Sequence, residues 1–195
     1  MLRDFHPTKK VLVETLSSML EKRRAADILV DEVLDESGVS KGSLYHHFED
    51  YQELIETTYV YRYKLWIDAS IDFLGKRVVP SRTKEDLREA LFDLTKLTQS
   101  DKRKGARSER AQALAECFQN ERLAKKMGEA TQRLTDAIAD VTDEVKNKGL
   151  FRDSVSSATL ATFIQAYTLG KIVNDYNPDG ISENEWDSFI METLS

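Results

Sequence analysis

The sequence contains few of the residues that interrupt helices or cross-link chains. It has one cysteine, Cys117, so no intrachain disulfide can form, which fits a reducing compartment. Its neighbours Glu116 and Phe118 supply no positive charge to stabilise a thiolate, so we interpret Cys117 as a small buried apolar residue. With only 3 prolines and 8 glycines among 195 residues, long helices can run without interruption.

Long apolar segments are also lacking. No stretch of about 18 uncharged apolar residues occurs, so we expect no membrane span. The longest charge-free stretch, residues 154–170, is too short and too rich in Ser, Thr and Gln. The first residues show no apolar core of a secretory signal, and we expect a cytoplasmic protein. The net charge of −6 argues mildly against a nucleic-acid partner, although the local charge distribution is more informative.

Helical periodicity dominates the chain, and no segment alternates as a strand would. We therefore predict an all-α protein. The expected helices cover about residues 8–24, 28–37, 41–47, 50–79, 83–100, 108–118, 123–148, 154–175 and 182–194, with a basic loop at 101–107. Capping pairs at Asp50/Glu53, Thr83/Asp86 and Ser182/Glu185 support three of the helix starts. The domain boundary is expected within the fourth helix, giving domains 1–65 and 66–195.

Residues 28–47 predict a helix, a tight turn and a second helix. Val30, Val33 and Leu34 share one face of the first helix, and Gly38 can adopt the positive φ that a tight turn requires. Ser40 is a good N-cap for the second helix, which turns Leu44 inward and leaves a polar outer face. This arrangement is typical of a helix that enters the major groove of DNA.

The charge around this segment is uneven. Residues 1–50 contain seven Lys and Arg and ten Asp and Glu, so we expect low nonspecific affinity for DNA. Residues 37–48, however, contain no acidic side chain and include Lys41. The surface expected to face phosphates is therefore locally free of negative charge.

The segment Gly38–Phe48, GVSKGSLYHHF, followed by Leu54, resembles the TetR family of bacterial regulators. The resemblance implies an N-terminal three-helix helix-turn-helix DNA-binding domain and a C-terminal helical ligand-binding and dimerisation domain. The sequence departs from the family pattern at three places. Leu29 stands where Thr is frequent, Val33-Leu34 where Ile-Ala is frequent, and Tyr51 where a phosphate-contacting Lys is usual.

We predict that DNA contacts come from the second helix of the motif and the start of the next helix. Gly42 would let the backbone approach a phosphate, Tyr45 would donate its hydroxyl to one, and Lys41 and Ser43 could reach phosphates or base edges. Adjacent His46 and His47 point about 100° apart and cannot chelate a metal together, and His6 lies in the N-terminal tail, so no metal or other cofactor is expected. The predicted DNA-binding residues are Ser40, Lys41, Gly42, Ser43, Tyr45, His46, His47 and Tyr51.

The resemblance also implies a cavity among the helices expected over residues 50–175. The aromatic side chains of these helices indicate a small, mainly apolar effector. The large side chains available to line the cavity are Tyr59, Tyr63, Trp66, Phe92, Phe118, Met127, Phe163 and Tyr167. For each of them, packing in the core is the competing interpretation.

The uncharged stretch 154–170 and the apolar stripe of the last helix predict a two-fold homodimer built as a four-helix bundle. The expected interface residues are Ala161, Ala166, Gly170, Trp186, Phe189 and Ile190. Such a dimer would bind a near-palindromic operator. The alternative is that residues 154–170 form the central core helix of a monomer. Residues 174–176 are interpreted as simply ending their helix.

The resulting prediction is a sequence-specific DNA-binding regulator, a repressor released from double-stranded DNA by a small ligand. One alternative is a TetR-like ligand-binding or interaction module without DNA binding. A second is an all-α enzyme, but the sequence shows no nucleophile elbow, phosphate loop, metal-ligand spacing or paired acid and base. We therefore predict that the chain is not an enzyme.

Overall fold

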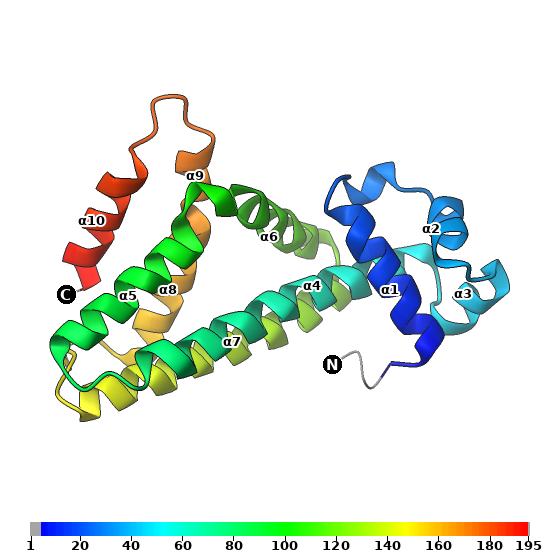
Figure 1. Cartoon of the computed structure of the whole chain (residues 1–195). Helices are drawn as coiled ribbons and strands as arrows, with labels where there is room; N and C mark the ends of the chain where they lie inside the picture. Colours follow the sequence, from blue (N-terminus) through cyan, green and yellow to red (C-terminus); the bar gives the residue numbers. More distant parts are fainter. Residues whose placement is uncertain (1–4, 195) are drawn as a thin grey trace. The chain divides into compact units, whose positions relative to one another are not determined.

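The computed structural model describes residues 5–194, and within this range all regular structure is helical (Figure 1), which confirms the all-α prediction. The chain divides into two compact units, residues 1–65 and 66–195, and the division falls within helix α4 (Tyr51–Phe73). No helix of the described range combines the length and apolar character that crossing a membrane requires.

The N-terminal unit contains α1 (Pro7–Leu20), a 3-10 turn (Ala25–Asp27), α2 (Val30–Ser37), α3 (Lys41–His47) and the first part of α4. Helix α1 packs against α2 and α3. Buried apolar side chains from all four helices, with Phe48 directly after α3, form much of the core of this unit: Leu12, Val13, Leu16, Val33, Leu44, Phe48 and Leu54. The apolar periodicity of the sequence thus marks the buried faces of these short helices.

Helix α1 ends at Leu20, earlier than the predicted Arg24. Arg23 lies beyond the helix because its guanidinium is held by other segments. It pairs with the Glu32 carboxylate at 2.8 Å and also donates to the Asp27 carbonyl. Arg24 pairs with Asp27 at 2.8 Å. These contacts stabilise the turn between α1 and α2 in place of another helical turn.

The C-terminal unit contains the rest of α4, a π-helical turn (Leu74–Val78), α5 (Lys84–Gln99), α6 (Lys104–Glu116), α7 (Glu121–Asn147), α8 (Ser157–Gly170), α9 (Ile172–Asp175) and α10 (Glu183–Leu194). Two 3-10 turns, Asp101–Arg103 and Cys117–Gln119, precede and follow α6. Helix α7 packs along α8, and α5 packs along α10.

The helix ends follow the capping signals in the sequence. Thr83 and Asp86 exchange hydrogen bonds between backbone and side chain, from Asp86 N to Thr83 Oγ1 at 3.1 Å and from Thr83 N to Asp86 Oδ2 at 2.9 Å. Ser182 and Glu185 form the same reciprocal arrangement. Gly149 follows α7 with a φ of +69°, a left-handed conformation that ends the helix and that glycine adopts without steric cost.

The predicted basic loop at 101–107 is wrong, because this segment forms the 3-10 turn and the first turn of α6. Arg107 explains the difference, since its side chain is fully buried instead of solvated. Its Nε and Nη2 atoms donate to the two carboxylate oxygens of Asp175, each at 2.6 Å. Its Nη1 donates to the carbonyls of Thr98 and Ser100, each at 3.1 Å. A partner 68 residues away is invisible to local periodicity.

The prediction of one helix over 154–175 is also wrong. Ser156 caps α8 by accepting from Thr159 N at 3.2 Å, and α8 gives way at Lys171 to the short α9. Lys171 is itself buried, with its ammonium 3.3 Å from the Asp175 carboxylate and 3.8 Å from that of Asp101. Asp175 therefore does more than end a helix, because it is the carboxylate partner of two buried cations.

Candidate functional site

The α2–turn–α3 segment has the geometry that its sequence predicts. Gly38 adopts a φ of +66° and a ψ of 16°, which reverses the chain after α2. Ser40 then accepts a hydrogen bond from the backbone N–H of Ser43 at 3.2 Å and so caps α3. Leu44 is fully buried and Phe48 almost so. These residues fix which face of α3 is turned away from the core.

Most of the side chains predicted to contact DNA lie on the outer face of α3. Lys41, Gly42, Tyr45 and His46 are exposed, whereas Ser43 and His47 are half-buried. A Cβ built on Gly42 would meet no atom within 4 Å, so nothing in the chain itself requires glycine there. Ser40 is exposed as well, but its hydroxyl is already bonded to Ser43.

The N-cap position of helix α2 lacks the side-chain hydroxyl that a threonine would supply. Leu29 occupies the N-cap position with an exposed side chain, and the Glu32 carboxylate accepts from the Leu29 backbone N–H at 2.8 Å. The hydrogen bond from Arg23 and, as the second cause, this one from Leu29 lower the pKa of Glu32. Pairing also screens Asp27 and Glu32, while Asp31, Asp35 and Glu36 remain exposed on α2.

Tyr51 lies at the start of α4, but its hydroxyl faces the protein. It donates to the backbone carbonyl of Ile28 at 3.0 Å, and partial burial raises the pKa of Tyr51 to about 12. In this conformation its only O–H proton is used within the unit, so the expected phosphate contact has no free donor. Tyr51 is therefore not part of the proposed DNA interface of α3.

The three histidines gather at one end of α3, contrary to the expectation that His6 is out of reach. The His6 and His47 rings lie 4.5 Å apart between centroids, and those of His46 and His47 lie 5.0 Å apart. His6 Nδ1 also accepts from Thr8 N at 3.3 Å and so caps α1. Among the described residues no group of three His, Cys, Asp or Glu side chains is arranged to hold a metal ion.

Desolvation lowers the pKa of His47, and the neighbouring His6, His46 and Lys9 lower it further. In an NMR titration we expect the His47 ring to titrate below the ordinary value of about 6.5. Because the folded unit binds fewer protons here than the unfolded chain, acidification through this range should destabilise it.

Replacing His6 with serine, which can still cap α1, should move the His47 midpoint upward without loss of helical content. A His47 midpoint that stays unchanged in His6→Ser would contradict the role of the ring contact.

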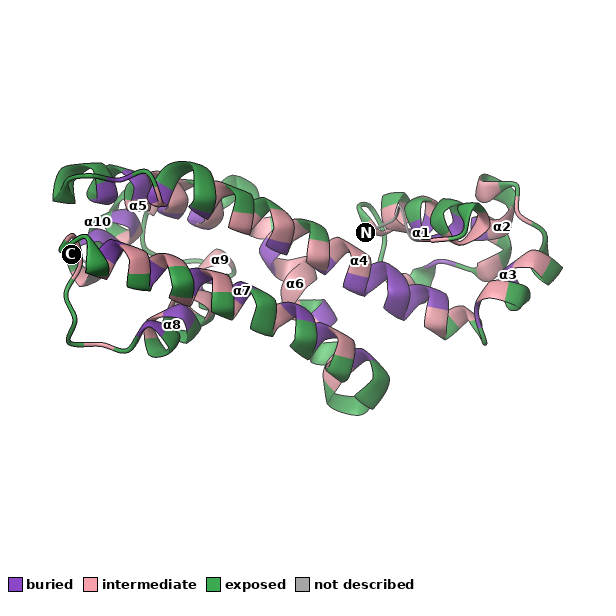
Figure 2. Ribbon diagram, turned by 90° about the horizontal axis from the view of Figure 1, so that it is seen from below, coloured by how far each residue is buried: buried purple, intermediate pink, exposed green. Residues whose placement is uncertain are grey.

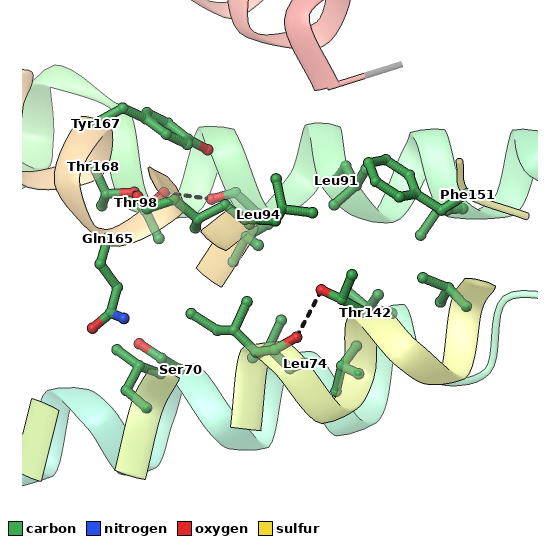
Figure 3. Close-up of a pocket in the computed structure, with 18 of the residues that line it drawn as sticks. Ser70, Leu74, Leu91, Leu94, Thr98, Thr142, Phe151, Gln165, Tyr167 and Thr168 are labelled. Atoms are coloured by element: carbon green, nitrogen blue, oxygen red, sulfur yellow. Dashed lines mark hydrogen bonds between the residues drawn. The ribbon is translucent and has the colours of Figure 1, made fainter. Parts of the chain in front are cut away.

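The C-terminal unit contains an apolar cavity walled by the end of α4 and by α5, α7 and α8 (Figure 3). The space open to the centres of water molecules is about 80 Å³, several times the roughly 10–15 Å³ that one water needs. Aliphatic side chains form most of the wall, among them Leu74, Leu91, Leu94, Leu134, Ile138 and Val145. Polar lining groups come from Ser70, Thr98, Thr142, Gln165, Tyr167 and Thr168.

Of the eight side chains predicted to line a pocket, Trp66 and Tyr167 do so. Tyr59 and Tyr63 are buried in the N-terminal unit, and Met127 is buried on α7 outside the cavity wall. Phe92, Phe118 and Phe163 point to solvent with 41%, 90% and 43% of their surface exposed. Leu87, Leu91 and Leu94 of α5 also line the cavity, but a stripe of leucines in a sequence gives no sign that it faces a cavity.

The residues predicted at a dimer interface fall into two groups. Ala161 is fully buried, because this face of α8 lies against α7, where Gln165 donates to Thr135 at 2.8 Å. Ile190 is buried as well, on a helix held to α5 by the 2.5 Å ion pair between Lys96 and Asp187. These two residues are therefore covered within their own unit.

The other members of the predicted interface are accessible. Ala166, Gly170 and Phe189 are exposed, and Trp186 is half-buried with its ring centroid 5.8 Å from the Lys171 ammonium. Phe163 and Val173 extend the exposed apolar surface along α8 and α9. Figure 2 shows that α8 carries both buried and exposed positions. Most of this surface carries no charge, which is unusual for the outside of a chain with 32% charged residues.

Cys117 is half-buried, with its Sγ 3.5 Å from the Ala113 carbonyl. Burial and the negative charge of Glu116 raise the pKa of its thiol. Cys117 therefore favours the neutral thiol over the thiolate at neutral pH.

Comparison with known proteins identifies the fold. No protein-family model matches the sequence, and no curated protein matches it significantly. Many solved structures do match. Three of them, described next, align over nearly the whole of both chains. The reduced form of NemR from Escherichia coli aligns with a TM-score of 0.71 at 14% identity, covering 96% of this chain and 97% of that one.

A TetR transcription regulator from Haloarcula marismortui aligns with a TM-score of 0.71 at 13% identity, covering 97% of each chain. A TetR-family transcriptional regulator from Cytophaga hutchinsonii aligns with a TM-score of 0.67 at 16% identity, covering 96% of this chain and 90% of that one. The chain therefore has the fold of the TetR-family regulators.

Proposed function

We propose that the chain is a cytoplasmic, sequence-specific DNA-binding regulator that acts as a homodimer and represses transcription until a small ligand releases it. The observation that carries the proposal is the outer face of α3. It presents Lys41, Gly42, Tyr45 and His46 to solvent after a tight turn at Gly38, with no acidic side chain on the helix. Side chains of these types bind phosphates and base edges.

The fold supports this proposal, since solved proteins that share it are described as transcriptional regulators. The cavity in the C-terminal unit supports the effector part. A ligand there could shift the protein between two states only by binding one of them more tightly. The cavity's lining is mainly aliphatic, so the effector has a mainly apolar body.

A second candidate is a TetR-like module that binds a ligand or a partner but no DNA. The exposed acids of α2 and the occupied hydroxyl of Tyr51 favour it, because both weaken attraction to phosphates. The two candidates differ in one measurement, which is binding to an operator found by genome-wide footprinting of the purified protein.

Lys41→Ala and Tyr45→Phe should each weaken operator binding by about 10- to 150-fold, the range expected for loss of one hydrogen bond to a charged group. Both side chains are exposed, so circular dichroism should show unchanged helical content. Gel shifts at one fixed salt concentration provide the measurement. Lys102→Ala removes an exposed cation from the C-terminal unit and serves as the charge-matched control.

Gly42→Ala is the sharpest variant of this series. The added methyl group meets no atom of the free protein, so weaker binding would report a close approach of DNA backbone to α3. If neither Lys41→Ala nor Tyr45→Phe changes the affinity, α3 is not the contact helix.

A further inference from the structure

We propose that the ligand of the C-terminal cavity is electrically neutral and donates a hydrogen bond from one end of an otherwise apolar body, as an alcohol, phenol or primary or secondary amide does. This inference rests on the proposed effector role of the cavity and names the chemistry of its ligand. Three features of the cavity favour such a ligand: the charge of its lining, the direction of the hydrogen bonds in the lining, and the cations near its wall.

The lining carries no charge. Among the described residues that form it, the sole ionisable side chain is Tyr167. Burial raises the pKa of Tyr167 to about 12, although the Thr168 and Thr95 hydroxyls lower it slightly, so the phenol is neutral at physiological pH. A carboxylate or ammonium group entering this space would leave water without meeting an opposite charge. The free-energy penalty for such a transfer strongly disfavours charged ligands.

Most polar groups of the lining gather at one end of the cavity, whereas Thr142 lies nearer the other, with its hydroxyl donating to the Ile138 carbonyl at 2.8 Å. Figure 3 shows Ser70, Thr98, Gln165, Tyr167 and Thr168 together at the polar end, and Leu91 and Phe151 toward the other. A ligand with one polar end and one apolar end matches this division. The aliphatic end would cover the hydrocarbon part of the ligand, and the polar end would receive its head group.

Three hydroxyl groups at the polar end, those of Ser70, Thr98 and Thr168, have already donated their protons. Ser70 Oγ donates to the Trp66 carbonyl at 2.9 Å, Thr98 Oγ1 to the Leu94 carbonyl at 2.8 Å, and Thr168 Oγ1 to the Ile164 carbonyl at 2.6 Å. Each is a bond to the carbonyl four residues earlier, a pattern that hydroxyls on helices often form. What these oxygens still offer to a ligand is acceptor capacity.

Gln165 repeats the pattern with its amide. Its Nε2 donates to Thr135 Oγ1 at 2.8 Å and, at 3.4 Å, to the Ala161 carbonyl. The amide oxygen remains as an acceptor. The polar end is therefore rich in acceptors, and a ligand that donates fits it better than one that can only accept, such as a carboxylate, phosphate or ether.

Cations near the wall argue against a positively charged donor. The buried Arg107 donates to the carbonyl of Thr98, a lining residue on α5. Lys171 lies three residues after Thr168, at the end of α8. Asp175 is the one buried carboxylate between these two cations. In addition, Arg110 lies over the Trp66 ring, 4.4 Å from its centroid, and covers an aromatic face that could otherwise hold a cation.

Four probes of nearly equal size test the assignment: n-octanol, heptyl methyl ether, octanoate and octylammonium. Binding to the full-length protein is measured at neutral pH by calorimetry. We expect n-octanol to bind about three- to tenfold more tightly than the ether, which has the same number of heavy atoms but no donor. The two ions should bind at least tenfold more weakly than the alcohol.

Gln165→Leu, of similar volume, removes one acceptor. It should weaken n-octanol binding while leaving the affinity for the ether within about twofold. Leu91→Trp, which fills the apolar end, should weaken both neutral probes and so shows that they occupy this cavity. A fold check by circular dichroism accompanies each variant.

The outcomes separate the inference from the proposed function. Equal binding of alcohol and ether, or tighter binding of either ion, overturns the assignment of the head group. If no probe binds, the cavity is not a site for ligands of this class and the inference fails. If n-octanol binds as expected but never weakens operator binding at saturation, the ligand chemistry stands and the repressor-release mechanism is wrong.

Discussion

Replacing Asp175 with asparagine should lower the free energy of unfolding of the C-terminal unit by about 3–5 kcal/mol, the usual cost of removing one partner of a buried ion pair. The Arg107 and Asp175 side chains are 0% and 1% exposed, and Lys171 is 1% exposed. Without the carboxylate, two buried cations would remain beside each other with no negative charge close to both. Urea unfolding monitored by circular dichroism provides the measurement.

The same carboxylate makes the unit sensitive to acid. Burial alone would raise the pKa of Asp175, but hydrogen bonds from Arg107 and Lys171 outweigh it and hold the pKa below its ordinary value. The stabilisation is therefore present above the unfolded pKa of about 3.9 and is lost as the pH falls through the lower folded value. In Asp175→Asn this part of the pH dependence should disappear.

Asp72→Asn is the matched control, because Asp72 pairs with Lys76 at 2.8 Å on the surface, where the two side chains are 59% and 72% exposed. Exposed pairs of this kind contribute about 0–1 kcal/mol, so this variant should unfold almost like the wild type. Similar destabilisation of both variants would mean that the buried pair has no special role.

Ala166→Glu should convert the proposed homodimer to monomers without unfolding the subunit. Ala166 is exposed at the middle of the uncharged face of α8, so a glutamate there disturbs no packing within the subunit. In a two-fold bundle the same position meets its symmetry mate, and two buried carboxylates would repel each other. We expect the dimer dissociation constant to rise by at least a hundredfold, measured by analytical ultracentrifugation.

Ala115→Glu places the same charge on an exposed alanine of α6 and should leave the dimer intact. A wild-type protein that sediments as a monomer at micromolar concentration would refute the proposed interface. If Ala166→Glu instead loses its helical signal, α8 packs inside a single subunit and the competing monomer interpretation holds.

Local sequence patterns predicted most helices because their determinants are local. The turn at Gly38, the cap at Ser40 and the cap pairs at Thr83 and Ser182 each depend on residues within four positions of one another. The prediction of where α6 begins was wrong because the start depends on the contact between Arg107 and Asp175, which lies 68 positions later. In a window around Arg107 the sequence is polar and basic, which is typical of a solvated loop.

The two candidate sites also differ in whether their determinants are local or distant in the sequence. The exposed face of α3 follows from helical phase, since Leu44 and Phe48 turn inward and leave Lys41 and Tyr45 outside. The cavity depends on which of many apolar side chains fail to meet across four helices. Aromatic size was a poor guide to it, because Phe118 is 90% exposed while smaller leucines form the wall.

The open space around Gly42 means that selection for helix stability and selection for contact with DNA favour different residues at this position. Alanine favours helices over glycine by up to about 1 kcal/mol, and here it would collide with nothing in the free chain. Selection for stability alone would therefore replace this glycine in a lineage that stopped using α3 to approach DNA. In a homologue of this chain, alanine at this position would thus indicate that α3 is not pressed against DNA, whatever the state of the ligand cavity.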